Sequence, residues 1–284
     1  MPEICFGQPL FYLNTVELSE INIYPVKGLK GIKLQESPVE PLGLRYDRRW
    51  MLVDINGKFI SQREFPVLSK LNCLHAPNGF RICSVNESDF IEIPFSTGGE
   101  ILKVMVWEDV VEAVIYNKIV DAWFSDFLKT DCTLVYLPEE SDRWVDPKYN
   151  RGKDKVSFAD AFPVLLIGEA SLEDLNLKLE HPISMDRFRP NLVFTGGLPF
   201  EEDTFDKFQI NDTVFVAAKP CARCQVITID QQTSMKSKEP LTTLSSYRTR
   251  DNKVNFGQNL LVETIGKPLR IGDRLEVLSR KPLP

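Results

Sequence analysis

The feature that most constrains this chain is a close succession of short apolar stretches separated by turn residues. Each stretch alternates apolar and polar side chains or is apolar throughout, as strands do when one or both faces are buried. Five of them follow one another within the first half, at residues 71–76, 79–83, 89–93, 101–106 and 110–115. Such close spacing favours a β-barrel or β-sandwich over an array of βαβ units.

Further strands are predicted on both sides of this run. Residues 16–23 alternate, 32–34 resume a strand after a turn, and Asn56-Gly57 stands between apolar runs as a strong hairpin turn. The second half adds strand-like stretches at 164–167, 192–194, 208–210, 213–218, 225–229, 260–262 and 269–277.

Three segments have helical spacing instead. Apolar side chains recur on one face within residues 118–129, and residues 169–180 place several leucines on one face. Residues 241–249 indicate a short third helix. The predicted fold class is therefore mostly β with a few helices, an α+β chain.

The domain organisation is predicted from length and from one break in the pattern. A chain of 284 residues suits one large domain or two ordinary ones. Residues 138–156 are polar and lack periodicity, which indicates a linker or a long surface loop. We therefore expect an N-terminal arm at 1–15, a first domain at 16–140 and a second at 141–284.

Composition excludes some classes of function. The net charge of -6 does not suit nonspecific binding of a nucleic-acid polymer. No apolar run reaches the roughly 18 residues that a membrane span needs. The first residues lack the basic start and apolar block of a signal peptide, so a cytoplasmic location without membrane attachment is expected.

Two cysteines with an arginine between them stand out in the second half, as Cys221-Ala222-Arg223-Cys224. A zinc site would need further ligands at matching spacing, and a thioredoxin-type motif would need a helix where the sequence favours a strand. A packed pair remains open. Arg223 is a cation that would favour the thiolate of a neighbouring cysteine, the form that binds soft metals. The other cysteines are predicted to be small buried hydrophobes: Cys5, Cys73, Cys83 and Cys132.

Basic residues are grouped at predicted strand ends of this acidic chain. Guanidinium and ammonium groups that converge there would bind a phosphate, although each group alone could be a solvated surface. The groups are Lys27 and Lys30; Arg45, Arg48 and Arg49; and Arg187 and Arg189. Single carboxylates in loops (Asp160, Asp186, Asp230) are interpreted as solvated, and the sequence contains no P-loop, dinucleotide fingerprint or nucleophile elbow.

Taken together, these residues resemble the MOSC family, and within it the two-part proteins that have an N-terminal MOSC β-barrel. Those are the bacterial YcbX-like proteins and the mitochondrial amidoxime-reducing component. The matching motifs run in order from about residue 16 to the end of the chain. They are Tyr24-Pro25-Val26-Lys27-Gly28, Gly43-Leu44, Asp47-Arg48-Arg49-Trp50, Phe162-Pro163, Glu169-Ala170-Ser171-Leu172, Phe188-Arg189-Pro190-Asn191, Cys221-Ala222-Arg223-Cys224, Glu239-Pro240-Leu241, Tyr247-Arg248, Phe256-Gly257-Gln258 and Ile271-Gly272-Asp273.

The resemblance implies a β-barrel-like N-terminal domain packed against a MOSC β-barrel domain, with one molybdenum cofactor (Mo-molybdopterin) site made by both. Cys224 would be the catalytic residue and metal ligand, with Arg223 as its electrostatic neighbour and Cys221 structural. The remaining cofactor-binding residues would be Lys27, Gly28, Arg48, Ala161, Phe162, Arg189, Asn191, Ala222 and Asn259. Gly28 and Ala222 replace serines that are common in the family, so only their backbone N–H groups could bind.

The implied function is reduction of N-hydroxylated compounds, such as hydroxylaminopurine bases, amidoximes and hydroxylamines, in a detoxification role. Electrons would come from a separate protein of the ferredoxin, flavin or cytochrome b5-like reductase type. Two alternatives remain open at this point. One is a sulfur-carrier or cofactor-handling protein that forms a persulfide on a cysteine. The other is a non-enzymatic β-barrel interaction protein with packed cysteines.

Overall fold

The structure is a computed structural model that describes residues 15–84, 89–95 and 98–282. Most of its regular elements are strands, and three are α-helices, so the predicted mostly-β fold class is confirmed for these residues. The predicted arm at 1–15 and Cys5 lie outside the described part, apart from residue 15. No helix within the described ranges is both long and apolar enough to span a membrane.

The largest sheet has the strand order β2-β1-β14-β13-β18-β16-β15-β20, with β17 paired to β18. Neighbours are antiparallel except β13 and β14, which are parallel. The strand bounds are β1 Glu17–Ile23, β2 Ile32–Leu34, β13 Val164–Gly168, β14 Leu192–Thr195, β15 Phe205–Ile210, β16 Thr213–Ala222, β17 Thr249–Arg250, β18 Lys253–Thr264 and β20 Leu275–Arg280.

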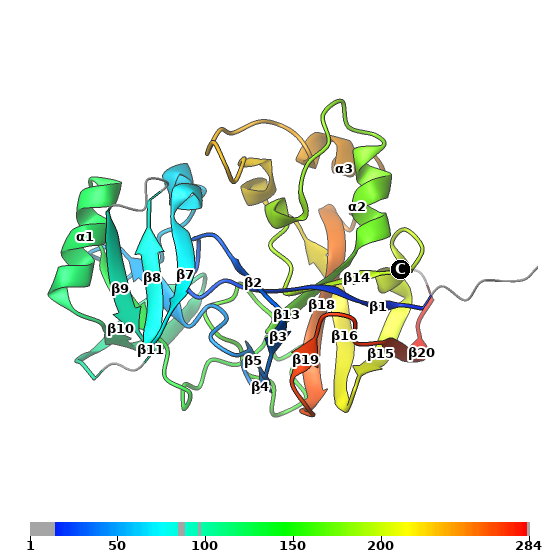
Figure 1. Cartoon of the computed structure of the whole chain (residues 1–284), viewed down its shortest axis with the longest axis horizontal. Helices are drawn as coiled ribbons and strands as arrows, with labels where there is room; N and C mark the ends of the chain where they lie inside the picture. Colours follow the sequence, from blue (N-terminus) through cyan, green and yellow to red (C-terminus); the bar gives the residue numbers. More distant parts are fainter. Residues whose placement is uncertain (1–14, 85–88, 96–97, 283–284) are drawn as a thin grey trace, which may run out of the picture.

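Two smaller sheets and α1 (Lys118–Leu128) lie at the other end of the molecule (Figure 1). One has the order β10-β11-β12-β6 and the other β7-β8-β9. Their bounds are β6 Trp50–Val53, β7 Asn72–Ala76, β8 Gly79–Cys83, β9 Phe90–Pro94, β10 Ile101–Val106, β11 Asp109–Ile115 and β12 Thr133–Tyr136. Short ladders pair β3 (Glu36–Ser37) with β19 (Leu269–Arg270), and β4 (Val39–Glu40) with β5 (Gly43–Leu44).

The two halves of the chain share structure. β1 comes from the first half, yet it lies beside β14 of the second half and pairs Ile21 with Leu192. One apolar cluster contains buried side chains from both halves, among them Phe80 and Phe208. The predicted division into 16–140 and 141–284 remains a prediction, and these contacts join its two parts into one core.

The predicted strand at 225–229 is wrong. Residues Gln225–Thr228 form a 3₁₀-helix, η4, and β16 instead continues through Ala222. Isolated β-propensity would favour a strand here, but Ile227 is buried in a separate apolar cluster and Thr228 Oγ1 donates to the Gln225 carbonyl at 2.8 Å. Tertiary packing overrides the preference of the β-branched side chains.

The second predicted helix is shorter than its leucine pattern indicates. α2 covers Glu169–Asn176, and α3 covers Leu241–Tyr247. The Asn176 side chain binds both the N–H and the carbonyl of Ile183, which holds the returning chain where the helix ends. Leu177 is accordingly exposed. The other 3₁₀-helices are η1 Pro66–Lys70, η2 Met185–Arg187 and η3 Glu201–Thr204.

Candidate functional site

One pocket lies where loops of both halves meet beside the end of β16. Every residue predicted for the cofactor site lines it, whichever half of the chain it comes from. Those residues are Lys27, Gly28, Arg48, Ala161, Phe162, Arg189, Asn191, Ala222, Arg223, Cys224 and Asn259. The structure therefore brings the predicted set together, while the role of each residue toward a ligand stays a prediction.

Two arginines that line this pocket face one buried tyrosine ring. The Arg48 and Arg189 guanidinium carbons lie 4.5 and 4.2 Å from the Tyr24 ring centroid. Both arginines have left-handed backbone conformations, with φ of 51° and 55°. Non-glycine residues in that region are strained, and such strain clusters at functional sites. The fold thus holds two cations close together despite their repulsion.

The charges of the two arginines are compensated unequally. Arg48 pairs with the buried Asp47 at 2.5 Å, whereas Arg189 Nη1 donates to the Leu29 carbonyl at 2.6 Å. Burial lowers the pKa of Arg189 to about 10, and the neighbouring Arg48 contributes to this shift. Arg189 therefore remains charged at neutral pH, and this positively charged lining of the pocket suits an anion.

Lys27 also lines the pocket and is tied to the second half. Its ammonium donates to the Phe158 carbonyl at 2.8 Å and to Asp160 at 2.5 Å. Burial lowers the pKa of Lys27, although the charge of Asp160 opposes the shift. Partial desolvation would raise the pKa of Asp160, but the charge of Lys27 and hydrogen bonds from Lys27 and Trp107 hold it below its usual range.

Asn191 fixes the loops that carry these cations. Its amide donates to the Asn22 carbonyl at 3.2 Å, and its Oδ1 accepts from the Leu165 backbone at 3.1 Å and from Arg48 at 3.3 Å. The side chain is buried, so these contacts connect three separate segments below the pocket. A ligand bound there would meet a preorganised wall.

In the cysteine motif, Arg223 contacts the thiol of Cys221, whereas it was expected to be the neighbour of Cys224. Arg223 Nη1 lies 3.0 Å from the Cys221 sulfur, and Nη2 donates to the Phe188 carbonyl at 2.6 Å. Cys224 is exposed and directly precedes η4, so its thiol is open to a ligand. Cys221 is half-buried and lines the same pocket, rather than being packed away from it.

The donor set of the pocket suits a cofactor that brings its own metal ligands. The described residues contain no group of three or more His, Cys, Asp or Glu side chains that could hold a metal ion by themselves. Arg223 Nε is buried and has no hydrogen-bond partner within the described part of the chain. An unsatisfied buried donor beside an exposed thiol is what a bound anionic group would complete.

Four of the basic residues singled out in the sequence do not line the pocket. Arg49 is buried against the Leu137 carbonyl, Arg45 pairs with Glu40 at the surface, and Arg187 pairs with Asp230. Lys30 also lies outside the lining. These side chains stabilise loops or remain in solvent, as the alternative interpretation of each basic group allowed.

Sequence reasoning missed several lining residues, most notably Asp160. It is solvated in part, as expected, but it also pairs with a lysine 133 positions away. No local sequence pattern predicts an ion pair between residues so far apart in the chain. The same holds for Phe59, Ser61, Gln62 and Arg63, which follow the Asn56-Gly57 turn and line the pocket.

Comparison with known proteins agrees with this architecture. The family model of the MOSC N-terminal beta barrel domain matches residues 15–131, and that of the MOSC domain matches residues 153–276. The chain belongs to the family of MOSC-domain proteins that carry an N-terminal MOSC β-barrel domain, and the expected resemblance is confirmed.

Individual relatives are of two kinds. Mouse mitochondrial amidoxime-reducing component 1 is 30% identical, with 93% of this chain and 82% of the relative covered. Rat mitochondrial amidoxime reducing component 2 is 32% identical over 90% of this chain and 81% of the relative. Rice molybdenum cofactor sulfurase is 32% identical over 89% of this chain, which spans about a third (33%) of that protein.

Proposed function

We propose that the pocket binds a molybdenum–molybdopterin cofactor and that the protein reduces N-hydroxylated compounds to the corresponding amines. The observation that carries the proposal is the convergence of the predicted residues around one exposed thiol, Cys224. The name of one kind of relative, amidoxime-reducing component, supports reduction of N-hydroxylated compounds, and that of the other, molybdenum cofactor sulfurase, supports molybdenum-related chemistry.

The residues present fit such a cofactor. The pocket cations Lys27, Arg48 and Arg189 would bind its phosphate, since guanidinium and ammonium groups form charge-assisted hydrogen bonds with phosphate oxygens. The free Nε of Arg223 would donate a further hydrogen bond. Cys224 would supply the single protein ligand, because thiolates bind soft or high-valent metals well. When bound, the cofactor would supply two-electron transfer.

The overall reaction is balanced as R–NH–OH + 2e⁻ + 2H⁺ → R–NH₂ + H₂O. The N–O bond breaks and the nitrogen is reduced; one added proton goes to the nitrogen, and the other goes to the hydroxyl oxygen, which leaves as water. The electrons would come from a separate donor protein of the ferredoxin, flavin or cytochrome b5-like type. The chain itself would orient the cofactor through its fixed cations and admit the substrate beside Cys224.

Metal analysis of protein made in a host that synthesises the cofactor tests the proposal. Wild type is expected to hold about one molybdenum per chain. The molybdenum content of Cys224→Ser is expected to be lower than that of wild type by more than about tenfold, because a hydroxyl replaces the ligating thiolate. Reduction of benzamidoxime with an artificial electron donor should fall in parallel.

The matched control is Cys132→Ser. That thiol lies away from the pocket and 3.6 Å from the Ser125 hydroxyl, so the new hydroxyl keeps a partner. This variant should retain molybdenum and activity. Wild type that holds no molybdenum, or equal molybdenum in both serine variants, would contradict the proposed site.

A second candidate is sulfur transfer or handling of the cofactor, which the 32% identity to the rice molybdenum cofactor sulfurase favours. The same exposed Cys224 would then carry a persulfide. Mass spectrometry would support this function if it finds a sulfur adduct on Cys224. Together with no turnover of benzamidoxime by molybdenum-loaded protein, that result would rule out the reductase.

A further inference from the structure

Asp160 lies at the border between the candidate site and a second, larger hollow. That groove has a volume of about 1380 Å³ and runs between the β10–β11 hairpin and the loop that follows Leu137. It shares Asp160 and Ala161 with the cofactor pocket, so the two hollows meet at these residues. A molecule that reaches the pocket through the groove must pass the Asp160 carboxylate.

One oxygen of this carboxylate is held and the other is open. Oδ1 accepts from the Lys27 ammonium at 2.5 Å and from the Trp107 indole at 3.2 Å. Oδ2 has no hydrogen-bond partner within the described ranges, and the side chain is 63% exposed. The carboxylate is thus fixed in orientation by two donors while half of its accepting capacity faces solvent.

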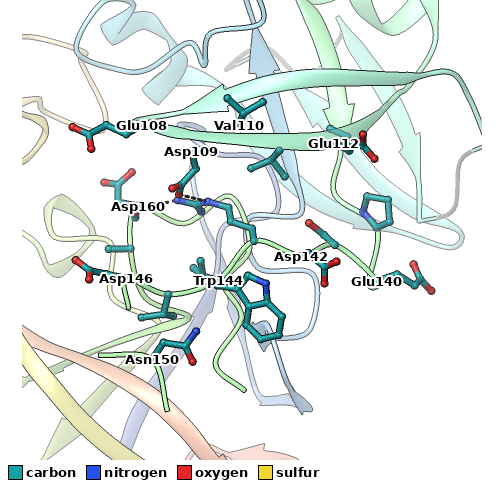
Figure 2. A pocket seen from close by; sticks show the side chains of 18 of the residues that line it. Glu108, Asp109, Val110, Glu112, Glu140, Asp142, Trp144, Asp146, Asn150 and Asp160 are labelled. Carbon is teal, nitrogen blue, oxygen red and sulfur yellow. Dashed lines mark hydrogen bonds and ion pairs between the residues drawn. The ribbon is translucent and has the colours of Figure 1, made fainter. Parts of the chain in front are cut away.

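The groove that leads to Asp160 is strongly negative. Figure 2 shows its carboxylates on both walls, with Asp160 at one end of the view and Glu140 at the other. The acidic lining residues are Glu108, Asp109, Glu112, Glu140, Asp142, Asp146 and Asp160.

Nearby cations offset three of these charges, because Arg143 pairs with Asp109, Lys155 with Asp142 and Lys27 with Asp160, while the other four carboxylates have no ion pair within the described residues. Arg143 is the one basic side chain among the described residues that line the groove. Its guanidinium is buried and binds Asp109 at 2.9 Å and the carbonyls of Ser157, Ala159 and Asp160. A cleft lined by one sign of charge raises the local concentration of opposite charges and repels like ones.

We propose that Asp160 is the residue that determines substrate charge preference, and that it selects N-hydroxylated compounds with a cationic group over anionic ones. This inference rests on the proposed function. The open Oδ2 accepts an N–H from the cationic end of the substrate, and the negative groove delivers such molecules. An anionic substrate meets repulsion along the groove and finds no donor at Asp160.

Steady-state kinetics with three matched compounds tests this. They are benzamidoxime, its 4-aminomethyl derivative (a cation) and its 4-carboxylate (an anion). Molybdenum-loaded wild type is expected to show a kcat/KM at least about tenfold higher for the cation than for the anion. Asp160→Asn should raise KM for the cation about tenfold with kcat little changed, and should improve kcat/KM for the anion.

Glu140→Gln is the matched control, because it removes the same unit charge from the far end of the groove. It should change the cation-to-anion ratio less than about twofold, since Glu140 is exposed, does not line the cofactor pocket, and is screened by solvent and salt. Equal ratios in Asp160→Asn and Glu140→Gln would overturn the role of Asp160. Wild type that treats the cation and the anion alike would also overturn it.

Asp160→Asn also removes a charge from beside Lys27, which is a proposed cofactor-binding residue. A second measurement that does not require the metal is therefore needed. Calorimetric titration of metal-free full-length protein with 4-(aminomethyl)benzamidine, the cationic product, should show about tenfold weaker binding to Asp160→Asn than to wild type. Equal affinities would overturn the inference. If loaded wild type reduces none of the three compounds, the proposed function fails, while this titration still decides the role of Asp160.

Discussion

Glu202 places a fully buried carboxyl group against the first residues of α2. Its oxygens accept hydrogen bonds from the Ser171 hydroxyl at 2.9 Å and from the Gly168 backbone at 3.3 Å. Burial and the neighbouring Asp203 raise its pKa from 4.5 to about 7, even though these hydrogen bonds favour the ionised form. The group therefore takes up a proton more readily in the folded protein than in the unfolded chain.

This shift has a defined sign for stability. Because the folded pKa lies above the unfolded one, the stabilisation is fully present below pH 4.5 and is lost as the pH rises through 7. The loss amounts to about 3 kcal/mol. Urea unfolding from pH 4.5 to 8 should show this component in wild type and not in Glu202→Gln, while Glu173→Gln on the exposed side of α2 should behave as wild type. Parallel pH profiles for wild type and Glu202→Gln would contradict it.

At the residue scale, the site residues that could be predicted from the sequence are those that belong to recognisable motifs. The thiol of Cys224 and the cations Lys27, Arg48 and Arg189 belong to motifs, and all of them line one pocket. Pairings across long separations could not be predicted in this way. The contact of Arg223 with Cys221 rather than Cys224 depends on where β16 ends, which no side-chain type reveals.

At the scale of elements, the long segment between β12 and β13 is organised by one buried arginine. Arg143 donates to the carbonyls of Ser157, Ala159 and Asp160, the last at 3.3 Å, and so sets the path of the chain into the pocket. Apart from an isolated bridge between Trp144 and Lys155, this stretch has no ladder to hold it. The carbonyls would be left without donors if the guanidinium were removed.

Arg143→Met is therefore expected to destabilise the protein by about 3 kcal/mol, because buried acceptors lose their partners. Hydrogen exchange measured by mass spectrometry should accelerate in residues 157–162. Arg81→Met provides the comparison, since Arg81 pairs with Glu92 in a half-exposed ion pair and the substitution should cost less than about 1 kcal/mol. Unchanged exchange in that segment of Arg143→Met would show that other contacts hold it.

Strands and helices with a strong local period were predictable to within a few residues. The alternation at 101–106 became β10 and the apolar stripe at 118–129 became α1. The failure at 225–229 has a physical cause, because burial of Ile227 decided that segment rather than its β-branched composition. The path of the loop around Arg143 could not be predicted from the sequence either. The partners of Arg143 are backbone carbonyls, which every residue has.

At the scale of the whole molecule, the candidate site exists only while both halves are folded together. β1 is hydrogen-bonded to β14 within the large sheet, and Lys27 of the first half binds Asp160 of the second. The shared apolar cluster crosses the same border. Two regions joined by a sheet ladder, an ion pair and a common core are expected to unfold as one cooperative unit.

The distribution of tryptophan makes this testable without any substitution. Three of the four tryptophans (Trp50, Trp107 and Trp123) lie in residues 16–140, and Trp144 lies just after them, so tryptophan fluorescence reports mainly on the first half. Far-ultraviolet circular dichroism reports on the strands of both halves. Thermal unfolding followed by the two probes should give coincident midpoints, because loss of β1 and Lys27 would remove support from the second half at the same temperature. A fluorescence midpoint well below the dichroism midpoint would mean that the first half opens independently, and that the pocket can come apart while the large sheet survives.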